Sequence, residues 1–148
     1  MRIETKQGII FPELSYKIIG AAFRVFNELG WGLPEKDYQA ALAKELSLSS
    51  LEYQREYFVP LKYKGENLSK YFADFLVSKQ ILLELKVVPK LGYAHARQIL
   101  TYLKSAGIKL GILLYFTREG VKYRRVLNSG VWLALLNKIS IIRDYSPW

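Results

Sequence analysis

The chain of 148 residues contains no cysteine and only one histidine. Without cysteine it can form neither a disulfide nor a thiolate zinc site, and it has no cysteine nucleophile. A single histidine also excludes a zinc site that needs two or more imidazole ligands. Metal chemistry in this chain must therefore rest on carboxylates, which favour Mg²⁺ or Mn²⁺.

Long apolar runs are also missing. No segment reaches the roughly 18 consecutive apolar residues of a membrane span, and the first residues lack the apolar core of a signal peptide. We therefore expect a cytoplasmic protein without a membrane partner. Apolar residues make up 51% of the chain and charged residues 24%, a globular composition. The length fits a single domain over residues 1–148.

Acidic residues are scarce in the second half of the chain. Residues 1–74 carry as many acidic as basic side chains, so the net charge of +9 arises entirely from residues 75–148. In that half only Glu84, Glu119 and Asp144 are acidic. Such an imbalance favours a polyanionic partner, nucleic acid first, although a merely solubilising surface has the same composition.

Hydrophobic periodicity and turn residues predict a mixed α/β sheet with helices packed against it. The predicted elements are helices over 12–29 and from Pro34 to about Leu46 (ended by Ser47–Ser50), strands over 57–63, 70–77 and 81–88, a helix over about 93–105, and strands over 109–117 and 122–128. Lys64–Asn67 is predicted as the turn between the first two strands. These elements form a core of about 12–128.

Residues 129–148 form a C-terminal extension whose role stays open. Val131–Asn137 is compatible with a short helix, and Ile139–Tyr145 with a strand or an ordered tail. Both are apolar enough to pack on the core or on the second subunit of a homodimer.

Three charged residues interrupt the two central apolar strands. The short break Ser78–Gln80 predicts a hairpin in which Asp74 lies directly opposite Glu84, about 5 Å away on one face. Lys86 shares that face because it lies two residues beyond Glu84 on the same strand.

Two carboxylates this close repel each other unless a cation lies between them. A divalent metal would resolve the repulsion, and the neighbouring ammonium would orient or deprotonate a water. The alternative is an exposed cross-strand Glu–Lys pair, which contributes little to stability. The apolar context, Phe72–Leu76 around Asp74 and Ile81–Val88 around Glu84, favours a site.

The next predicted helix adds polar groups at helical spacing. His95, Gln98 and Tyr102 follow one stripe of its surface. The amide and the phenol could bind phosphate oxygens or hold Lys86 and a water. For His95, a packing role is as compatible with the sequence as a functional one.

Several short motifs follow one another in order between residues 15 and 128. They are Gly32, Glu35 and Tyr38 in Gly32–Tyr38, then Ala73–Val77, Leu83–Lys86, and Gln98 with Tyr102. Together they resemble the GxxExxY proteins, a family of the PD-(D/E)XK nuclease superfamily, and its RecB-like QxxxY branch. Phe26 stands where that family often has histidine, and Ala73 replaces the nominal proline. Neither departure removes an expected ligand.

The resemblance implies a restriction-endonuclease-like core of helix, three-stranded meander, helix and further strand. It also implies roles for individual residues: Glu35, Asp74 and Glu84 as metal ligands, Lys86 as the catalytic lysine, and Gln98 and Tyr102 as the QxxxY pair. For Tyr38, a role at the site and packing beneath it stay equally open.

The sequence thus predicts a Mg²⁺- or Mn²⁺-dependent nuclease that hydrolyses phosphodiester bonds of nucleic acid, DNA more than RNA. A backbone carbonyl at Leu85 is a further candidate ligand. The candidate phosphate-binding residues are Lys90, His95, Arg97, Lys104, Arg124 and Arg125.

Three other functions are compatible with parts of the sequence. A non-catalytic nucleic-acid-binding subunit of a repair or nuclease complex would retain the fold but would not need the complete set of acidic residues and lysine. A scaffold that dimerises through its tail leaves the charges within the strands unexplained. A serine hydrolase is disfavoured because no nucleophile-elbow motif is present.

Overall fold

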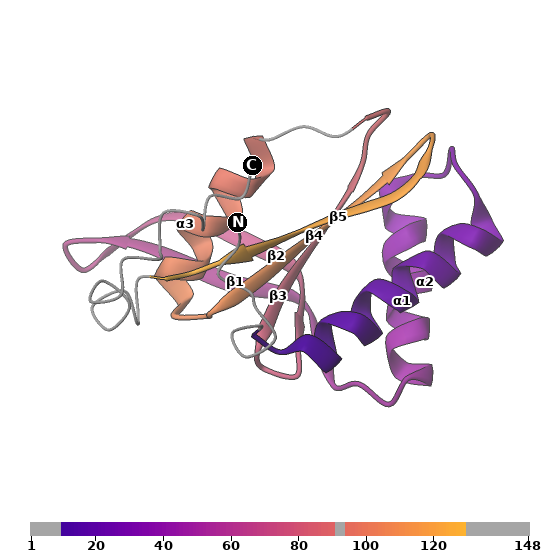
Figure 1. The fold of residues 1–148 in the computed structure, drawn as a ribbon. Coiled ribbons are helices and arrows are strands. Elements are labelled where there is room, and N and C mark those ends of the chain that lie inside the picture. Colours follow the sequence, from indigo (N-terminus) through magenta and orange to yellow (C-terminus); the bar gives the residue numbers. More distant parts are fainter. Residues whose placement is uncertain (1–9, 91–93, 130–148) are drawn as a thin grey trace, which may run out of the picture.

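The computed structural model of the protein describes residues 10–90 and 94–129, which form three helices and a five-stranded sheet (Figure 1). The elements are α1 (Pro12–Leu29), α2 (Glu35–Leu48), β1 (Tyr53–Tyr63), β2 (Glu66–Val77), β3 (Ile81–Val87), α3 (Ala94–Ala106), β4 (Leu110–Thr117) and β5 (Gly120–Leu127). The strands lie in chain order across the sheet. This confirms the predicted mixed α/β class.

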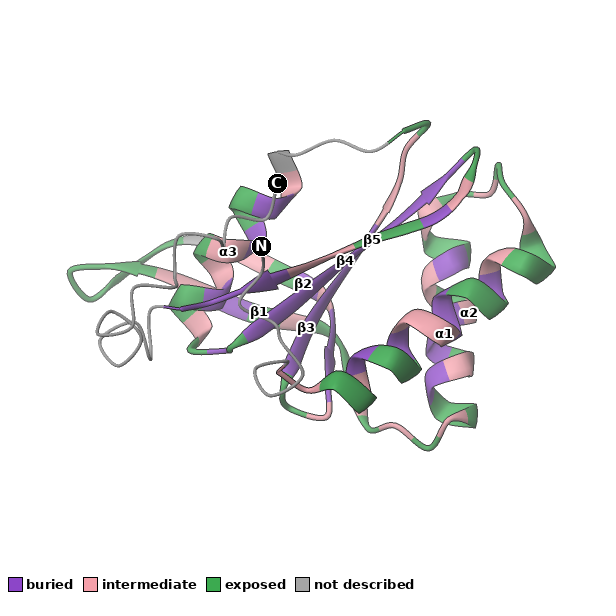
Figure 2. Ribbon diagram, viewed as in Figure 1, coloured by how far each residue is buried: buried purple, intermediate pink, exposed green. Residues whose placement is uncertain are grey.

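Helices cover both faces of the sheet. Helices α1 and α2 lie on one face and α3 lies on the other (Figure 1). All strand pairs are antiparallel except β3 and β4, which are parallel. A parallel pair requires a crossover connection, and α3 is that crossover. Every residue of β4 is buried, as expected of a strand covered on both faces, and Figure 2 shows the buried strands between the exposed outer surfaces of the helices.

Two apolar clusters fill the spaces between the sheet and its helices. The first joins α1 and α2 to inward residues of the sheet such as Phe75, Leu83 and Leu85. The second joins α3 to the other face through residues such as Ala73 and Leu82. In β3, odd-numbered residues therefore face α1 and α2, whereas even-numbered residues face α3.

Some element boundaries differ from the predicted ones. Helix α2 continues through Ser47 to Leu48, and β2 begins at Glu66 because only Lys64 and Gly65 form the turn. Strand β1 begins at Tyr53, since it pairs with Val77 at the end of the long β2. In each case, tertiary pairing or packing extends an element beyond its local signal. The predicted Val131–Asn137 helix, the Ile139–Tyr145 segment and any dimer contact they make lie outside the described residues.

The predicted hairpin register is confirmed. Strands β2 and β3 pair as Val77 with Ile81, Leu76 with Leu82, and Phe75 with Leu83. This is the register in which Asp74 is opposed to Glu84. The β2–β3 ladder ends at the Phe75–Leu83 pair, just before those two carboxylates.

The pattern of faces inverts in β1 and β2 at Asp74. Phe75 packs under α1 and α2, but Ala73 packs under α3, although residues two apart share a face in a regular strand. The β1 residue at this level, Glu56, has a φ of 49° and is skipped in the pairing, as is Asp74. A positive φ is uncommon for a residue with a Cβ. The local twist therefore sets the direction of the Asp74 side chain.

Gly111 allows α3 to approach β4 closely. A Cβ at this position would lie 2.9 Å from Ile99 Cδ1 and 3.2 Å from Leu103 Cδ1, both buried on α3. We expect Gly111→Val to lower the free energy of unfolding by about 1–3 kcal/mol through overpacking, although valine favours strands locally. Urea unfolding measures the change.

The matched control is Gly20→Ala within α1, where the nearest atom to a new Cβ is Arg24 Nη1 at 3.5 Å. That variant should be neutral or more stable by up to about 1 kcal/mol. Wild-type stability of Gly111→Val would show that α3 does not pack this closely on β4.

Candidate active site

The carboxylates of Asp74 and Glu84 each accept a hydrogen bond from the opposite strand, just beyond the end of the β2–β3 ladder. The N–H of Asp74 donates to Glu84 Oε2 at 3.2 Å, and the N–H of Leu85 donates to Asp74 Oδ2 at 2.7 Å. Each carboxylate thus accepts a backbone donor of the opposite strand. The two predicted acidic residues are brought together, and these two residues with Lys86 are called the carboxylate notch below.

Burial raises the pKa values of both acids of the carboxylate notch. The pKa of Glu84 is raised from 4.5 to about 7, mainly by burial and also by the charge of Asp74, against the opposing effects of the Tyr71 hydroxyl and Lys86. Burial also raises the pKa of Asp74, although the Leu85 N–H and Lys86 lower it. Two acids whose pKa values stay raised beside a lysine form a place where an added cation is favourable.

Lys86 is more exposed to solvent than the acid beside it in the carboxylate notch. Its Nζ is 3.9 Å from Glu84 Oε1, and 28% of its side chain is exposed, against 7% for Glu84. The ammonium is therefore accessible to a ligand while remaining attached electrostatically to the buried acid. This is the placement that the strand alternation predicts.

Helix α2 contributes a third carboxyl group from its first residue. Burial raises the pKa of Glu35, and the charge of Asp74 adds to this, while Lys86 and the backbone N–H of Val87 lower it. Glu35 thus interacts electrostatically with the carboxylate notch, and its role as a metal ligand stays a prediction. Tyr38 instead packs in the core, where the centroid of its ring lies 4.6 Å from that of Phe116. Its hydroxyl donates to the carbonyl of Gly30.

Gln39 is a site residue that the sequence analysis missed. Its Nε2 donates to Asp74 Oδ1 at 3.1 Å, so the amide fixes the oxygen that does not bind Leu85. The available signal was its spacing: Gln39 lies four residues after Glu35 and so shares a face of α2 with it.

Tyr71 is the second missed residue, and it explains how α3 reaches the site. Its hydroxyl donates to Glu84 Oε2, and its ring stacks on that of Tyr102 with centroids 3.5 Å apart and planes 4° from parallel. Tyr102 therefore supports Glu84 through Tyr71 and has no direct hydrogen bond to the acid. Regular alternation would place Tyr71 and Asp74 on opposite faces, and the inversion at Asp74 obscured their relation.

The remaining polar candidates on α3 lie farther from the acids. Gln98 is exposed one turn before Tyr102, and within the described part of the chain it makes no hydrogen bond. The pKa of His95 is lowered by burial and by the charge of Lys86, and its ring centroid lies 6.0 Å from that of Tyr115. His95 is therefore near the catalytic lysine of the prediction, whereas Gln98 faces solvent.

The predicted phosphate-binding cations are spread over both sides of the sheet. Lys90 is exposed just beyond β3, and Arg97 and Lys104 are exposed on α3. Burial raises the pKa of Tyr115, and Arg124 lies close enough for its charge to oppose that effect. Arg125 alternates to the face of α1, where its guanidinium donates to the carbonyl of Ile10.

The donor set of the carboxylate notch fits a hard divalent cation. Within residues 10–90 and 94–129, no three histidine, aspartate or glutamate side chains converge closely enough to form a ready-made metal cluster. Asp74 and Glu84 nevertheless offer oxygen ligands only, the type that Mg²⁺ and Mn²⁺ prefer. Burial raises the pKa of both acids, and a bound cation would favour their charged forms.

Comparison with known proteins identifies the family. Residues 12–126 match the family model of the PD-(D/E)XK nuclease superfamily. The chain therefore belongs to this superfamily, whose members are nucleases. No curated protein sequence matches the chain. The GxxExxY and QxxxY resemblances stay predictions about its place within the superfamily.

The chain is also similar to solved structures at low sequence identity. It resembles an alkaline exonuclease from Laribacter hongkongensis at 12% identity and a TM-score of 0.46, over 79% of this chain and 81% of that one. The same enzyme in complex with dAMP gives 12% and 0.47 over 84% and 87%, and SSO0001 gives 17% and 0.40 over 97% and 90%. These likenesses add nothing to the family assignment.

The helices described here are all too short or too polar to cross a bilayer.

The raised pKa of Glu84 predicts how the stability of the metal-free protein depends on pH. Between 4.5 and about 7 the native carboxyl keeps a proton that the unfolded chain releases. The free energy of unfolding in EDTA should therefore fall as the pH rises through this window, by up to about 3 kcal/mol. Asp74 and Glu35 act in the same direction.

Urea unfolding at a series of pH values measures this dependence. Glu84→Gln should flatten the profile between these pH values, whereas Glu66→Gln, a change at an exposed residue at the start of β2, should leave it as in the wild type. A Glu84→Gln profile that matches the wild type would contradict the assignment.

Proposed function

We propose that the protein is a divalent-metal-dependent nuclease that hydrolyses phosphodiester bonds of DNA in preference to RNA. The observation that carries the proposal is the buried carboxylate of Glu84 and the half-buried carboxylate of Asp74, beside the accessible ammonium of Lys86. The superfamily supports nuclease chemistry. The choice of Mg²⁺ or Mn²⁺ rests on the all-oxygen donor set.

Each residue of the carboxylate notch has a defined task in this proposal. Asp74 and Glu84 would hold the cation. Glu35 and the carbonyl of Leu85 are the further candidate ligands. When bound, such a cation stabilises developing negative charge on the phosphoryl group and makes water a better nucleophile. Gln39 keeps Asp74 in orientation through its 3.1 Å hydrogen bond, and Tyr71 does the same for Glu84.

Lys86 supplies the cationic group of the site. Its Nζ lies 3.9 Å from Glu84 Oε1 and its side chain is partly exposed, so a water beside the proposed cation could also hydrogen-bond to this ammonium. Lys86 orients this water for attack and balances the charge of the phosphate that enters. Arg97, Lys104 and Arg124, with His95 and Lys90, are proposed to hold neighbouring phosphates, which contributes salt-sensitive affinity without sequence preference.

The test is cleavage of single-stranded, duplex and branched DNA and of RNA, with EDTA, Mg²⁺ or Mn²⁺. Glu84→Ala and Lys86→Ala should each lower the metal-dependent rate by about 10²–10⁴-fold, the usual contribution of a group that handles the proton of a nucleophile. Matched controls are Glu66→Ala and Lys79→Ala, at exposed positions outside the carboxylate notch, which should cleave like the wild type.

Wild-type rates in both Glu84→Ala and Lys86→Ala would refute the mechanism. Binding of nucleic acid without cleavage of any substrate would instead favour a non-catalytic subunit with the same fold.

A further inference from the structure

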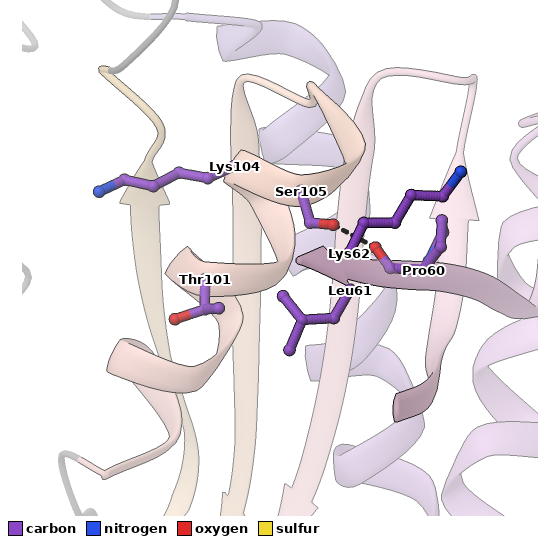
Figure 3. A pocket seen from close by; sticks show the side chains of 6 residues that line it. All are labelled: Pro60, Leu61, Lys62, Thr101, Lys104 and Ser105. Atoms are coloured by element: carbon purple, nitrogen blue, oxygen red, sulfur yellow. Dashed lines mark hydrogen bonds between the residues drawn. The ribbon is translucent and has the colours of Figure 1, made fainter. Parts of the chain in front are cut away.

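A groove between β1 and α3 lies outside the carboxylate notch. It has a volume of about 660 Å³ and is lined by Pro60, Leu61, Lys62, Thr101, Lys104 and Ser105 (Figure 3). The Ser105 hydroxyl donates to the carbonyl of Pro60 and so joins the two walls. Helix and strand are thereby held together at the floor of the groove, while its mouth is open.

The polar groups of the groove are suited to an anion. No acidic residue lines it, and the ammonium groups of Lys62 and Lys104 extend on opposite sides (Figure 3). Both lysines are exposed, and neither belongs to any of the three ion pairs found among the described residues. The Thr101 hydroxyl donates to its own helix at the carbonyl of Arg97 at 3.3 Å.

Helix α3 connects the groove to the carboxylate notch. Thr101 directly precedes Tyr102, whose ring stacks on Tyr71, and Tyr71 donates to Glu84. From Thr101 to Ser105 the helix rises about 6 Å, so Tyr102 and the groove residues lie on adjoining turns of one helix. A strand of nucleic acid with a phosphate at the notch would extend along this helix.

We propose that the groove binds the backbone of a single strand of nucleic acid next to the scissile phosphate. Lys62 and Lys104 each neutralise a phosphate, one on either side of the groove. This inference rests on the proposed function for the identity of the substrate. A positively charged groove that follows the backbone is one feature of single-strand binding, and the helix that carries Lys104 also carries Tyr102, whose ring lies against that of Tyr71 beside Glu84.

The experiment measures binding of fluorescein-labelled oligodeoxythymidylate in EDTA over a range of salt concentrations. Removing two phosphate contacts to a single strand should reduce the slope of log affinity against log salt by about 1.4. We expect this loss of slope, with weaker binding at each salt concentration, for Lys62→Ala/Lys104→Ala. A blunt duplex of the same length should be affected less.

The matched control is Lys17→Ala/Lys44→Ala, which removes two exposed lysines from α1 and α2, on the other side of the sheet. It removes the same net charge and should leave the slope unchanged. Circular dichroism and the thermal midpoint check that both double variants fold.

Wild-type affinity and slope in Lys62→Ala/Lys104→Ala would overturn the proposal. An equal loss for duplex and single strand would overturn the single-strand assignment, and an equal loss in the control variant would reduce the effect to net charge. Because binding is measured without metal, failure of catalysis is separate: a protein that binds through the groove but cleaves nothing contradicts the proposed function alone. A wild type that binds no nucleic acid contradicts both.

Discussion

Two carboxylates hold β2 and β3 together at the point where their ladder ends. Beyond the Phe75–Leu83 pair, the N–H of Leu85 binds Asp74 and the N–H of Asp74 binds Glu84. The backbone donors at the end of the ladder are thus satisfied by the same side chains that form the carboxylate notch. Burial makes this arrangement electrostatically unfavourable on its own, as the pKa of about 7 for Glu84 indicates. The same two carboxylates therefore complete the backbone hydrogen bonds and form the proposed cation site.

The rest of the fold keeps these carboxylates in place. From one side, α2 contributes Gln39, which binds Asp74. From the other side, α3 contributes Tyr102, which supports Glu84 through the ring and hydroxyl of Tyr71. The twist at Asp74, where the faces of β1 and β2 invert, allows residues from both sides of the sheet to meet at one point. A sheet with regular alternation would separate them.

Local signals in the sequence were sufficient for the elements and for the central pair of acids. The three-residue break at Ser78–Gln80 determines the hairpin register, and with it the opposition of Asp74 and Glu84. The sequence could not reveal Tyr71 or Gln39, because their contacts depend on the inverted strand faces and on how α2 packs. Assigning side chains to faces by alternation requires a regular strand. Strand β1 is irregular at Glu56, which has a positive φ. Helix spacing likewise grouped Gln98 with Tyr102, although only Tyr102 makes a contact that leads to Glu84.

The central claim is that the carboxylate notch binds a divalent cation. A crystal structure of the protein grown with Mn²⁺, with anomalous diffraction recorded, tests it most directly. The account predicts an anomalous peak between Asp74 and Glu84, at about 2.0–2.3 Å from an oxygen of each. The claim would be contradicted by Mn²⁺ bound only elsewhere, or by no anomalous peak in the notch at a saturating Mn²⁺ concentration.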